Sequence, residues 1–371
     1  MLTERLSPTE LTLASKLPPS IADRLNGRDN NIKLLRMVAA SLVILGHSFS
    51  VSRGPSFVAW PAPILPFSFG TLAVDIFFTL SGFLITKSYV ERGDLAAFLR
   101  ARALRIYPAG VTAVLVTALG FGLAFTTLDP SSYLRNHDTW SYVTRNIHLT
   151  MAPIRMTLPG VFTANPTPSA VNDPLWTLPY EVWMYGFAAF AGVVGLLGRR
   201  VLFNVAAACL IAGYWVINCA APTALEGPAL TPFWRLAFFF LFGATAYVNR
   251  DAVPLRFSIF AAGVVICFLT FGSAWYRLWV SVTLAYGTLH AAFTPAEWLR
   301  RYNRFGDFSY GLYVFGFPIQ QVVAAIAPGI MPYPLFAASM SLGLPVAMLS
   351  WWYIEEPALR FKDGSRSRRL S

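Results

Sequence analysis

The sequence predicts an all-α membrane protein, a polytopic bundle of about ten transmembrane helices with both termini in the cytoplasm. Hydrophobic residues make up 56% of the 371 residues, and charged residues only 13%. Soluble domains carry about a quarter charged residues. The net charge is +11. In a soluble protein this excess would indicate nucleic-acid binding, but in a membrane protein basic residues collect in cytoplasmic loops. We therefore expect no nucleic-acid partner.

Ten apolar runs are long enough to cross about 30 Å of hydrocarbon as helices. They cover residues 33–52, 70–90, 107–127, 176–197, 201–219, 232–248, 257–273, 275–293, 308–327 and 335–354. An even number of spans places both termini on one side. With the N-terminus inside, the basic residues left outside are Arg53, Arg135, Arg145, Arg155, Arg235 and Arg277. Continuous apolar runs of this length argue against a closed barrel.

The chain divides into a cytoplasmic N-terminal tail (1–31), a transmembrane domain (32–360) and a basic cytoplasmic tail (361–371). The outer segment 128–175 is too polar to span the membrane and too long for a simple connection. This segment is a candidate lid or acceptor-binding surface. The cysteines lack the spacing of a disulfide framework or a zinc site, so we expect no metal; they are Cys209, Cys219 and Cys267.

Ionisable side chains are costly in hydrocarbon, so the few within the spans are candidate functional residues. In the first span, His47 follows Arg36 by eleven positions and lies in the outer half. A histidine there is suited to general-base catalysis, because its imidazole titrates near neutral pH. The alternative is a histidine that only forms a packing hydrogen bond with a neighbouring helix.

Two carboxylates are expected at a depth similar to that of His47, because their spans enter from outside. Asp75 lies near the start of the second span, before the small pair Ser81-Gly82 that would permit close helix contact, and Glu181 lies near the start of the fourth. Either carboxylate could orient the imidazole and stabilise its protonated form. The alternatives are a favourable helix-dipole interaction for Asp75 and interfacial anchoring for Glu181.

A basic cluster marks the inner face before the third span, where Pro108 is expected in the first helical turn. Arg102 and Arg105 are three positions apart and share a helix face. Their guanidinium groups match phosphate oxygens, so with Arg36 they are candidates for binding a phosphate-bearing donor. The alternative is that they serve topology alone. Aromatic candidates for an acceptor site or a pocket are Trp176, Tyr180 and Tyr313.

Six segments in order resemble membrane acyltransferase family 3, the integral-membrane O-acyltransferases of bacterial surface glycans. They are LRMVAASLVILGHS, VDIFFTLSGFLI, FLRARALRIYP, LWTLPYEVWMY, FGDFSYGLYVFGFPI and YIEEPALRF. The resemblance extends from about residue 30 to residue 360. It implies that His47 is the essential histidine, that Arg36 is its basic companion and that Arg102 and Arg105 belong to the acyl-CoA site. Glu181 would be the family's acidic residue.

The sequence departs from the family at Gly316, where many members have histidine. We expect the single-domain type, without an SGNH-type domain after the last helix. The resemblance further implies an O-acetyltransferase of the bacterial inner membrane, with acetyl-CoA as a donor substrate and no bound cofactor. Its other partners would be membrane lipids and a cell-surface polysaccharide, or the lipid-linked precursor of one.

Several alternatives stay open at this point. The hydroxyl could attack the thioester directly with His47 as base, or His47 could first accept the acetyl group. The acceptor could be a small molecule or a peptidoglycan sugar. A transporter or flippase with a proton path through His47, Asp75 and Glu181 is the rival from another class.

Overall fold

The computed structural model describes residues 19–25, 30–57, 65, 67–150, 154–220 and 230–362. This part of the chain is helical and contains isolated bridges but no strand, which confirms the predicted all-α class. The elements in chain order are η1 (Ala22–Arg24), α2 (Ile32–Arg53), α3 (Phe69–Arg92), α4 (Leu95–Leu115), η2 (Val116–Phe121), α5 (Gly122–Phe125), α6 (Pro130–Arg135), α7 (His137–Ile147), η3 (Asp173–Thr177), α8 (Leu178–Val193), η4 (Leu196–Gly198), α9 (Arg200–Ala220), α10 (Leu230–Val248), α11 (Phe257–Leu269), α12 (Tyr276–Phe293), α13 (Glu297–Arg300), η6 (Arg301–Arg304), α14 (Ser309–Ile326), α15 (Pro332–Ser350), η7 (Trp351–Glu355) and α16 (Glu356–Arg360).

A helix overlaps each of the predicted apolar runs. Within the described residues, 5 helical stretches are long and apolar enough to cross a membrane, namely Ile32–Arg53, Phe69–Arg92, Leu95–Phe125, Ser309–Ile326 and Pro332–Arg360. The protein is therefore a multi-pass membrane protein. The total of ten spans and the orientation of the termini stay predictions.

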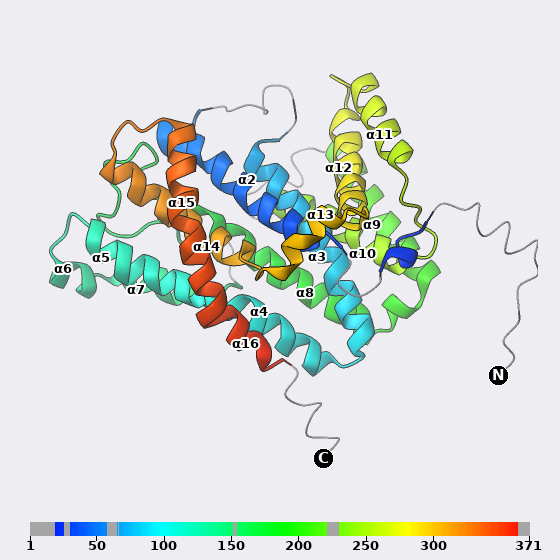
Figure 1. Cartoon of the computed structure of the whole chain (residues 1–371), viewed down its shortest axis with the longest axis horizontal. Coiled ribbons are helices and arrows are strands. Elements are labelled where there is room, and N and C mark those ends of the chain that lie inside the picture. Colours follow the sequence, from blue (N-terminus) through cyan, green and yellow to red (C-terminus); the bar gives the residue numbers. More distant parts are fainter. Residues whose placement is uncertain are drawn as a thin grey trace, which may run out of the picture.

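Helix α14 packs against both α2 and α15 (Figure 1). Most of its residues are buried. The helix nevertheless carries buried amides, which need hydrogen-bond partners in this setting. Gln320 Nε2 donates to the carbonyl of Ile44 at 2.8 Å, and Gln321 Nε2 donates to the carbonyl of Thr167 at 2.9 Å. These bonds tie α14 to α2 and to the segment before η3.

Helices α3 and α10 meet through glycines. A Cβ atom on Gly82 would collide with the backbone of Phe240, and one on Gly243 would collide with the backbone of Thr79. Small residues let membrane helices approach backbone to backbone. The close contact predicted from the Ser81-Gly82 pair is thus confirmed.

Helix α4 begins earlier than predicted. Its N-cap is Asp94, whose carboxylate accepts hydrogen bonds from the backbone amides of Ala96 and Ala97 at 3.1 Å. Pro108 consequently lies inside the helix rather than in its first turn, so that prediction is wrong. The physical reason is that a polar, arginine-rich stretch extends the helix beyond the apolar run. Arg102 and Arg105 therefore sit on a regular helical face.

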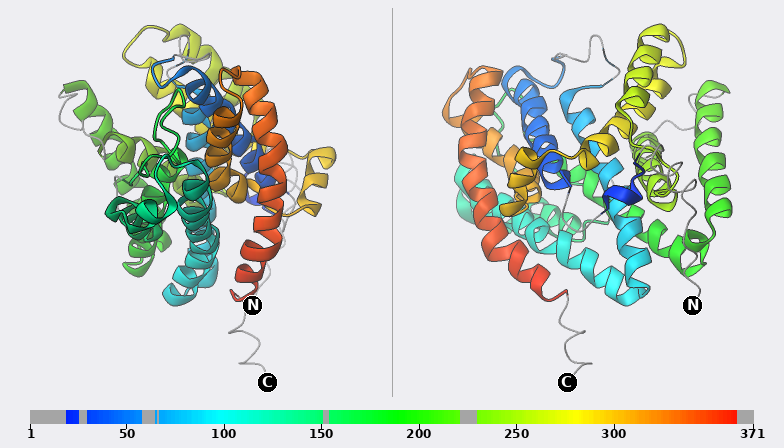
Figure 2. Two further views of the ribbon diagram at one scale, coloured as in Figure 1. Left: turned by 90° about the vertical axis from the view of Figure 1, so that its left-hand side faces the viewer. Right: turned by 45° about the vertical axis from the view of Figure 1, so that its right-hand side comes forward.

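The peripheral elements lie at two ends of the molecule. Helices α6 and α7 lie at one end, and α11 and α12 project at the other (Figure 1). The second view of Figure 2 shows α15, η7 and α16 as one long rod that leads to the C-terminus. Residues 1–18, 26–29 and 363–371 lie outside the described residues, so the predicted terminal tails stay predictions.

Candidate functional site

A cavity of about 1300 Å³ opens between α2, α3, α4, α8, α14 and the α15–α16 rod. Ligand pockets commonly measure about 300–1,000 Å³, so this one has room for a large substrate. Of the described residues that line it, the basic ones are Lys33, Arg36, Lys87, Arg92, Arg100, Arg102, Arg105, Arg304, Arg360 and Lys362, and the acidic ones are Glu91, Asp94, Glu181, Asp307 and Glu356. The cavity is therefore electropositive. It suits an anionic ligand.

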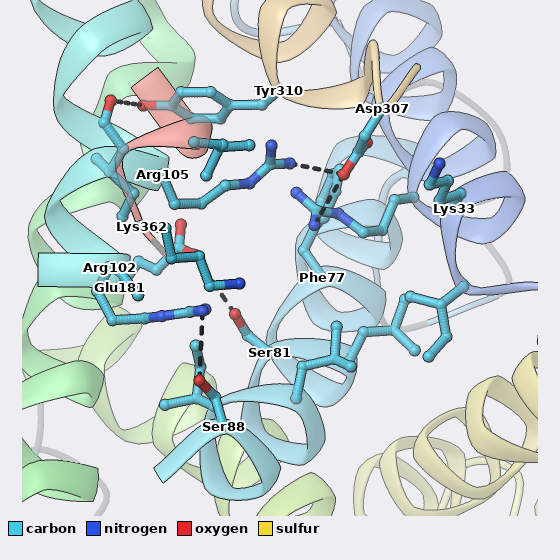
Figure 3. Close-up of a pocket in the computed structure, with 18 of the residues that line it drawn as sticks. Lys33, Phe77, Ser81, Ser88, Arg102, Arg105, Glu181, Asp307, Tyr310 and Lys362 are labelled. Atoms are coloured by element: carbon cyan, nitrogen blue, oxygen red, sulfur yellow. Dashed lines mark hydrogen bonds and ion pairs between the residues drawn. The ribbon is translucent and has the colours of Figure 1, made fainter. Parts of the chain in front are cut away.

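Asp307 connects two helices at the wall of this cavity (Figure 3). Its Oδ2 atom lies 2.7 Å from Arg105 Nη2 on α4 and 3.2 Å from Arg36 Nη1 on α2. Ser309 Oγ donates to Oδ1 at 2.5 Å. Burial alone would raise the pKa of the Asp307 carboxyl, but Arg36 and Arg105 outweigh burial and lower the pKa well below its ordinary value. Asp307 is thus a charged bridge between α2 and α4.

Arg105 has a second carboxylate partner on the α15–α16 rod. Its Nη1 atom lies 3.5 Å from Glu355 Oε2, and Ser350 Oγ donates to Glu355 Oε1 at 3.1 Å. Glu355 ends the π-helical turn η7, which shifts the helical register by one residue. The π turn helps to aim Glu355 at Arg105. The guanidinium of Arg105 is held by acidic groups on two sides.

Arg102 has a different environment. Its Nη2 atom donates to Ser88 Oγ at 3.5 Å, and its guanidinium lies 5.9 Å from the centre of the Tyr185 ring. Its buried Nε atom has no hydrogen-bond partner in the described structure. Arg102 therefore keeps donor capacity for a ligand, whereas Arg36 and Arg105 already share Asp307. The sequence predicted that all three arginines bind the acyl donor. In the structure, Arg102 has an N–H group without a hydrogen-bond partner, whereas Arg36 and Arg105 form ion pairs.

Glu181 lies at the inner part of the cavity, beside Arg102 in Figure 3. Tyr185 Oη donates to Glu181 Oε1 at 2.5 Å, and Ser81 Oγ donates to the same atom at 3.4 Å. Tyr313 and Thr177 also line the cavity. Glu181 is held by neutral hydroxyl groups of α8 and α3.

His47 does not line the cavity. Its Nδ1 atom lies 3.7 Å from Asp173 Oδ2, and its ring meets the Phe317 ring edge to face at 5.0 Å. The side chains of His47 and Asp173 are 19% and 32% exposed, so protein atoms do not enclose this pair completely. A carboxylate beside Nδ1 favours the tautomer in which Nε2 is free to accept a proton.

Buried amides place Asp173 beside His47. Asn172 Nδ2 donates to the carbonyl of Val314 at 2.9 Å. Asn165 Nδ2 donates to the carbonyl of Gln321 at 2.9 Å, and Gln321 Nε2 donates back to the carbonyl of Thr167. These bonds fix the last part of the 128–175 segment along α14. Asp173, the first residue of η3, follows directly from that anchored stretch.

The carboxylate that lies beside His47 is neither of the two that the sequence suggested. Asp75 Oδ1 pairs with Arg235 Nη1 of α10 at 3.3 Å, and Glu181 faces the cavity. Neither forms a contact with His47 in the described structure. Helical depth placed Asp75 and Glu181 at the level of His47, but depth does not say which way a side chain points. Asp173 occupies the expected position, and the catalytic roles of Asp75 and Glu181 stay predictions.

The aromatic candidates separate in the same way. Tyr313 lines the cavity. Trp176 instead contacts Tyr180, with ring centroids 5.8 Å apart, and Tyr180 contacts Trp183, with ring centroids 5.4 Å apart. Within the described residues, no group of three or more His, Cys, Asp or Glu side chains could hold a metal ion.

Sequence reasoning missed Asp173, Thr177 and Glu355. Glu355 lay in a recognised segment but had no assigned role, and its position near the basic inner face was an available signal. Thr177 also lay in a recognised segment, LWTLPYEVWMY, but neither Thr177 nor Asp173 had a feature that indicated a role. Both belong to η3, and only the packing of η3 on α14 reveals their partners.

The chain is similar to known proteins over most of its length. A family model described as an acyltransferase domain matches residues 29–352. A protein of Shigella phage Sf6 named O-acetyl transferase is 27% identical over 338 residues, which cover 89% of this chain and 96% of the relative. Nodulation protein 10 of Rhizobium leguminosarum bv. viciae is 28% identical over 377 residues, covering 93% of this chain and 97% of the relative. No solved structure matches the chain.

Proposed function

The chain belongs to the acyltransferase family whose model covers residues 29–352, and from this premise we propose that it is an O-acetyltransferase of the bacterial inner membrane. The donor is cytoplasmic acetyl-CoA. The acceptor is a hydroxyl of a cell-surface polysaccharide or of its lipid-linked precursor. The relative named O-acetyl transferase supports acetyl as the group transferred. Family membership gives no support to the transporter or flippase alternative.

The observation that carries this proposal is the electropositive cavity. Acetyl-CoA presents phosphate groups at one end and a thioester at the other. Basic side chains such as Arg92, Arg100 and Lys362 line the part of the cavity near the ends of α3, α4 and the rod. These side chains suit phosphate groups. The part of the cavity near Phe77 and Tyr313, away from these basic side chains, suits the uncharged pantetheine arm.

Arg102 is the residue that we assign to direct donor binding. Its unpartnered Nε atom lies inside the cavity wall, where an unsatisfied buried donor costs about 1–3 kcal/mol. A phosphate oxygen would satisfy this donor. Arg36 and Arg105 shape the site instead, because Asp307 lies within 3.2 Å and 2.7 Å of them. Asp307 and Glu355 balance the charges of Arg36 and Arg105. The positive charge that favours an anionic ligand comes from the other basic side chains that line the cavity.

His47 serves as the general base. Its Nε2 atom takes the proton of the acceptor hydroxyl while the hydroxyl oxygen bonds to the thioester carbon. The carbon–sulfur bond then breaks, and the departing CoA thiolate recovers the proton from the imidazolium. Asp173, 3.7 Å from Nδ1, stabilises the imidazolium that exists between these two events.

The two substrates would approach from opposite sides. The cavity entrance is basic, and basic loops face the cytoplasm. His47 does not line the cavity, and it pairs with Asp173, which belongs to the anchored end of the 128–175 segment. With the predicted orientation, acetyl-CoA enters from the cytoplasm and the glycan arrives from outside.

The test is transfer by the purified protein. The protein in lipid nanodiscs would be incubated with acetyl-labelled acetyl-CoA and surface glycan extracted from cells that lack the gene. We expect label in the glycan with wild type and none with His47→Ala, while both proteins bind acetyl-CoA. Wild-type protein that binds acetyl-CoA without labelling any glycan would refute the acceptor class. Full activity of His47→Ala would refute the role of His47.

A further inference from the structure

Two hydroxyl side chains, those of Tyr313 and Thr177, meet where α14 and η3 line the cavity. Tyr313 Oη donates to the carbonyl of Pro174 at 2.8 Å and lies 2.5 Å from Thr177 Oγ1. The ring of Phe77 meets the Tyr313 ring edge to face at 5.7 Å. Tyr313 and Thr177 are 7% and 4% exposed. All three side chains line the cavity, so together they form one wall of it.

The His47 site lies directly behind this wall and is built from the same two elements. On α14, Phe317 contacts His47 and lies four residues beyond Tyr313, a rise of about 6 Å. On η3, Asp173 pairs with His47, while the next residue, Pro174, accepts the hydrogen bond from Tyr313. The wall and the His47 site are therefore formed by neighbouring residues of α14 and η3.

The backbone on both sides of the wall is fixed. Asn172 holds η3 to the carbonyl of Val314, the residue after Tyr313. Tyr313 itself is the second link between α14 and η3. Because the Asn172 bond remains when the Tyr313 hydroxyl releases Pro174, a side-chain rotation can open the wall without separating the two elements.

We propose that Tyr313 and Thr177 form a gate that separates the donor cavity from His47 and keeps water away from the thioester until an acceptor is bound. The inference rests on the proposed function, because it takes the cavity as the acetyl-CoA site. In the closed state the thioester stops at the wall. Opening brings the carbonyl carbon to the acceptor oxygen beside His47.

A leaking gate has a defined chemical consequence. A water oxygen would bond to the thioester carbon, the carbon–sulfur bond would break, and acetate and free CoA would form, the CoA thiol taking one proton of the water. The closed hydroxyl pair suppresses this hydrolysis. Tyr313 and Thr177 are positioning residues, since neither is assigned a bond to the reacting atoms.

The experiment measures CoA release without acceptor, followed with a thiol reagent, together with acetyl-CoA affinity. The double variant Tyr313→Phe/Thr177→Val removes the hydroxyl pair and keeps the side-chain volumes. We expect affinity within twofold of wild type and acceptor-independent CoA release raised about tenfold, the effect of about 1.4 kcal/mol. Thr177→Ser, which retains the hydroxyl, should release CoA as slowly as wild type.

A matched control removes another buried Tyr and Thr hydroxyl away from the cavity. In Tyr133→Phe/Thr139→Val, the lost bonds run to the carbonyls of Ala118 and Tyr133. We expect no rise in CoA release. A gate variant that binds acetyl-CoA but releases CoA no faster than this control would overturn the gate alone. Wild-type protein that binds no acetyl-CoA would overturn the proposed function and the gate with it.

Discussion

Replacement of Asp307 by asparagine tests the charged bridge of the cavity wall. The carboxylate is 11% exposed and serves Arg36 and Arg105, whose side chains are 22% and 13% exposed. Removing one partner of a buried ion pair costs about 3–5 kcal/mol. Both arginines border the cavity and Arg105 keeps Glu355, so we expect the lower end of this range, about 3 kcal/mol. This corresponds to roughly a 150-fold change in the folded-to-unfolded ratio.

The assay is unfolding of the purified protein in mixed micelles of increasing denaturing-detergent content. The matched control is Asp138→Asn, because Asp138 pairs with Arg155 at 3.0 Å but is 57% exposed. A pair this exposed contributes at most about 1 kcal/mol. If Asp307→Asn destabilised the protein no more than Asp138→Asn, the bridge would not stabilise the fold and the reasoning would be refuted.

The pH dependence has a definite sign. Because the folded-state pKa of Asp307 is lowered, its contribution to stability is fully present above the ordinary aspartate pKa of about 3.9. The contribution is lost as the pH falls from there toward the folded-state pKa. Wild type should therefore lose more stability than Asp307→Asn between about pH 5 and pH 2. Parallel pH profiles for the two proteins would contradict the assigned charge state.

Three further predictions concern the site and its orientation. Arg102→Lys should weaken acetyl-CoA binding about tenfold, because a lysine lacks the guanidinium fork. Arg301→Lys, at an exposed arginine that does not line the cavity, should change the affinity less than twofold. Equal affinities of the Arg102→Lys variant and the wild type would indicate that Arg102 serves only to set the topology. Asp173→Asn should lower kcat about 100-fold with unchanged acetyl-CoA binding, and an unchanged kcat would exclude Asp173 as the partner of His47. In a background without native cysteines, Ser56→Cys and Thr163→Cys should react with an impermeant thiol reagent added from outside, and Ala96→Cys should not; the reverse pattern would invert the topology.

Most of the helical framework could be predicted from the sequence, because apolar runs of sufficient length identify membrane helices directly. The beginning of α4 could not, since Arg100, Arg102 and Arg105 interrupt the apolar pattern while the backbone remains helical. Hydropathy identifies the residues that are stable in lipid. It does not show where a helix such as α4 begins when its first turns line a polar cavity.

The candidate site was predicted in its residue types but not in its pairings. His47, Glu181 and the arginines followed from the cost of charge in a membrane. Depth along a helix, however, fixes only one coordinate of a side chain. The rotation that directs Asp75 toward Arg235, and the loop packing that brings Asp173 to His47, depend on contacts between segments far apart in the chain.

The most direct test of the central claim is the sidedness of transfer in vesicles that hold the protein in one orientation. Acetyl-labelled acetyl-CoA is supplied on one face of the membrane, and the glycan acceptor is enclosed on the other. We predict labelled glycan only when acetyl-CoA is on the face where Ala96→Cys reacts with the impermeant reagent, and none with His47→Ala. Equal labelling when acetyl-CoA is supplied only on the face of Ser56 and Thr163 would contradict entry of the donor through the arginine-lined cavity.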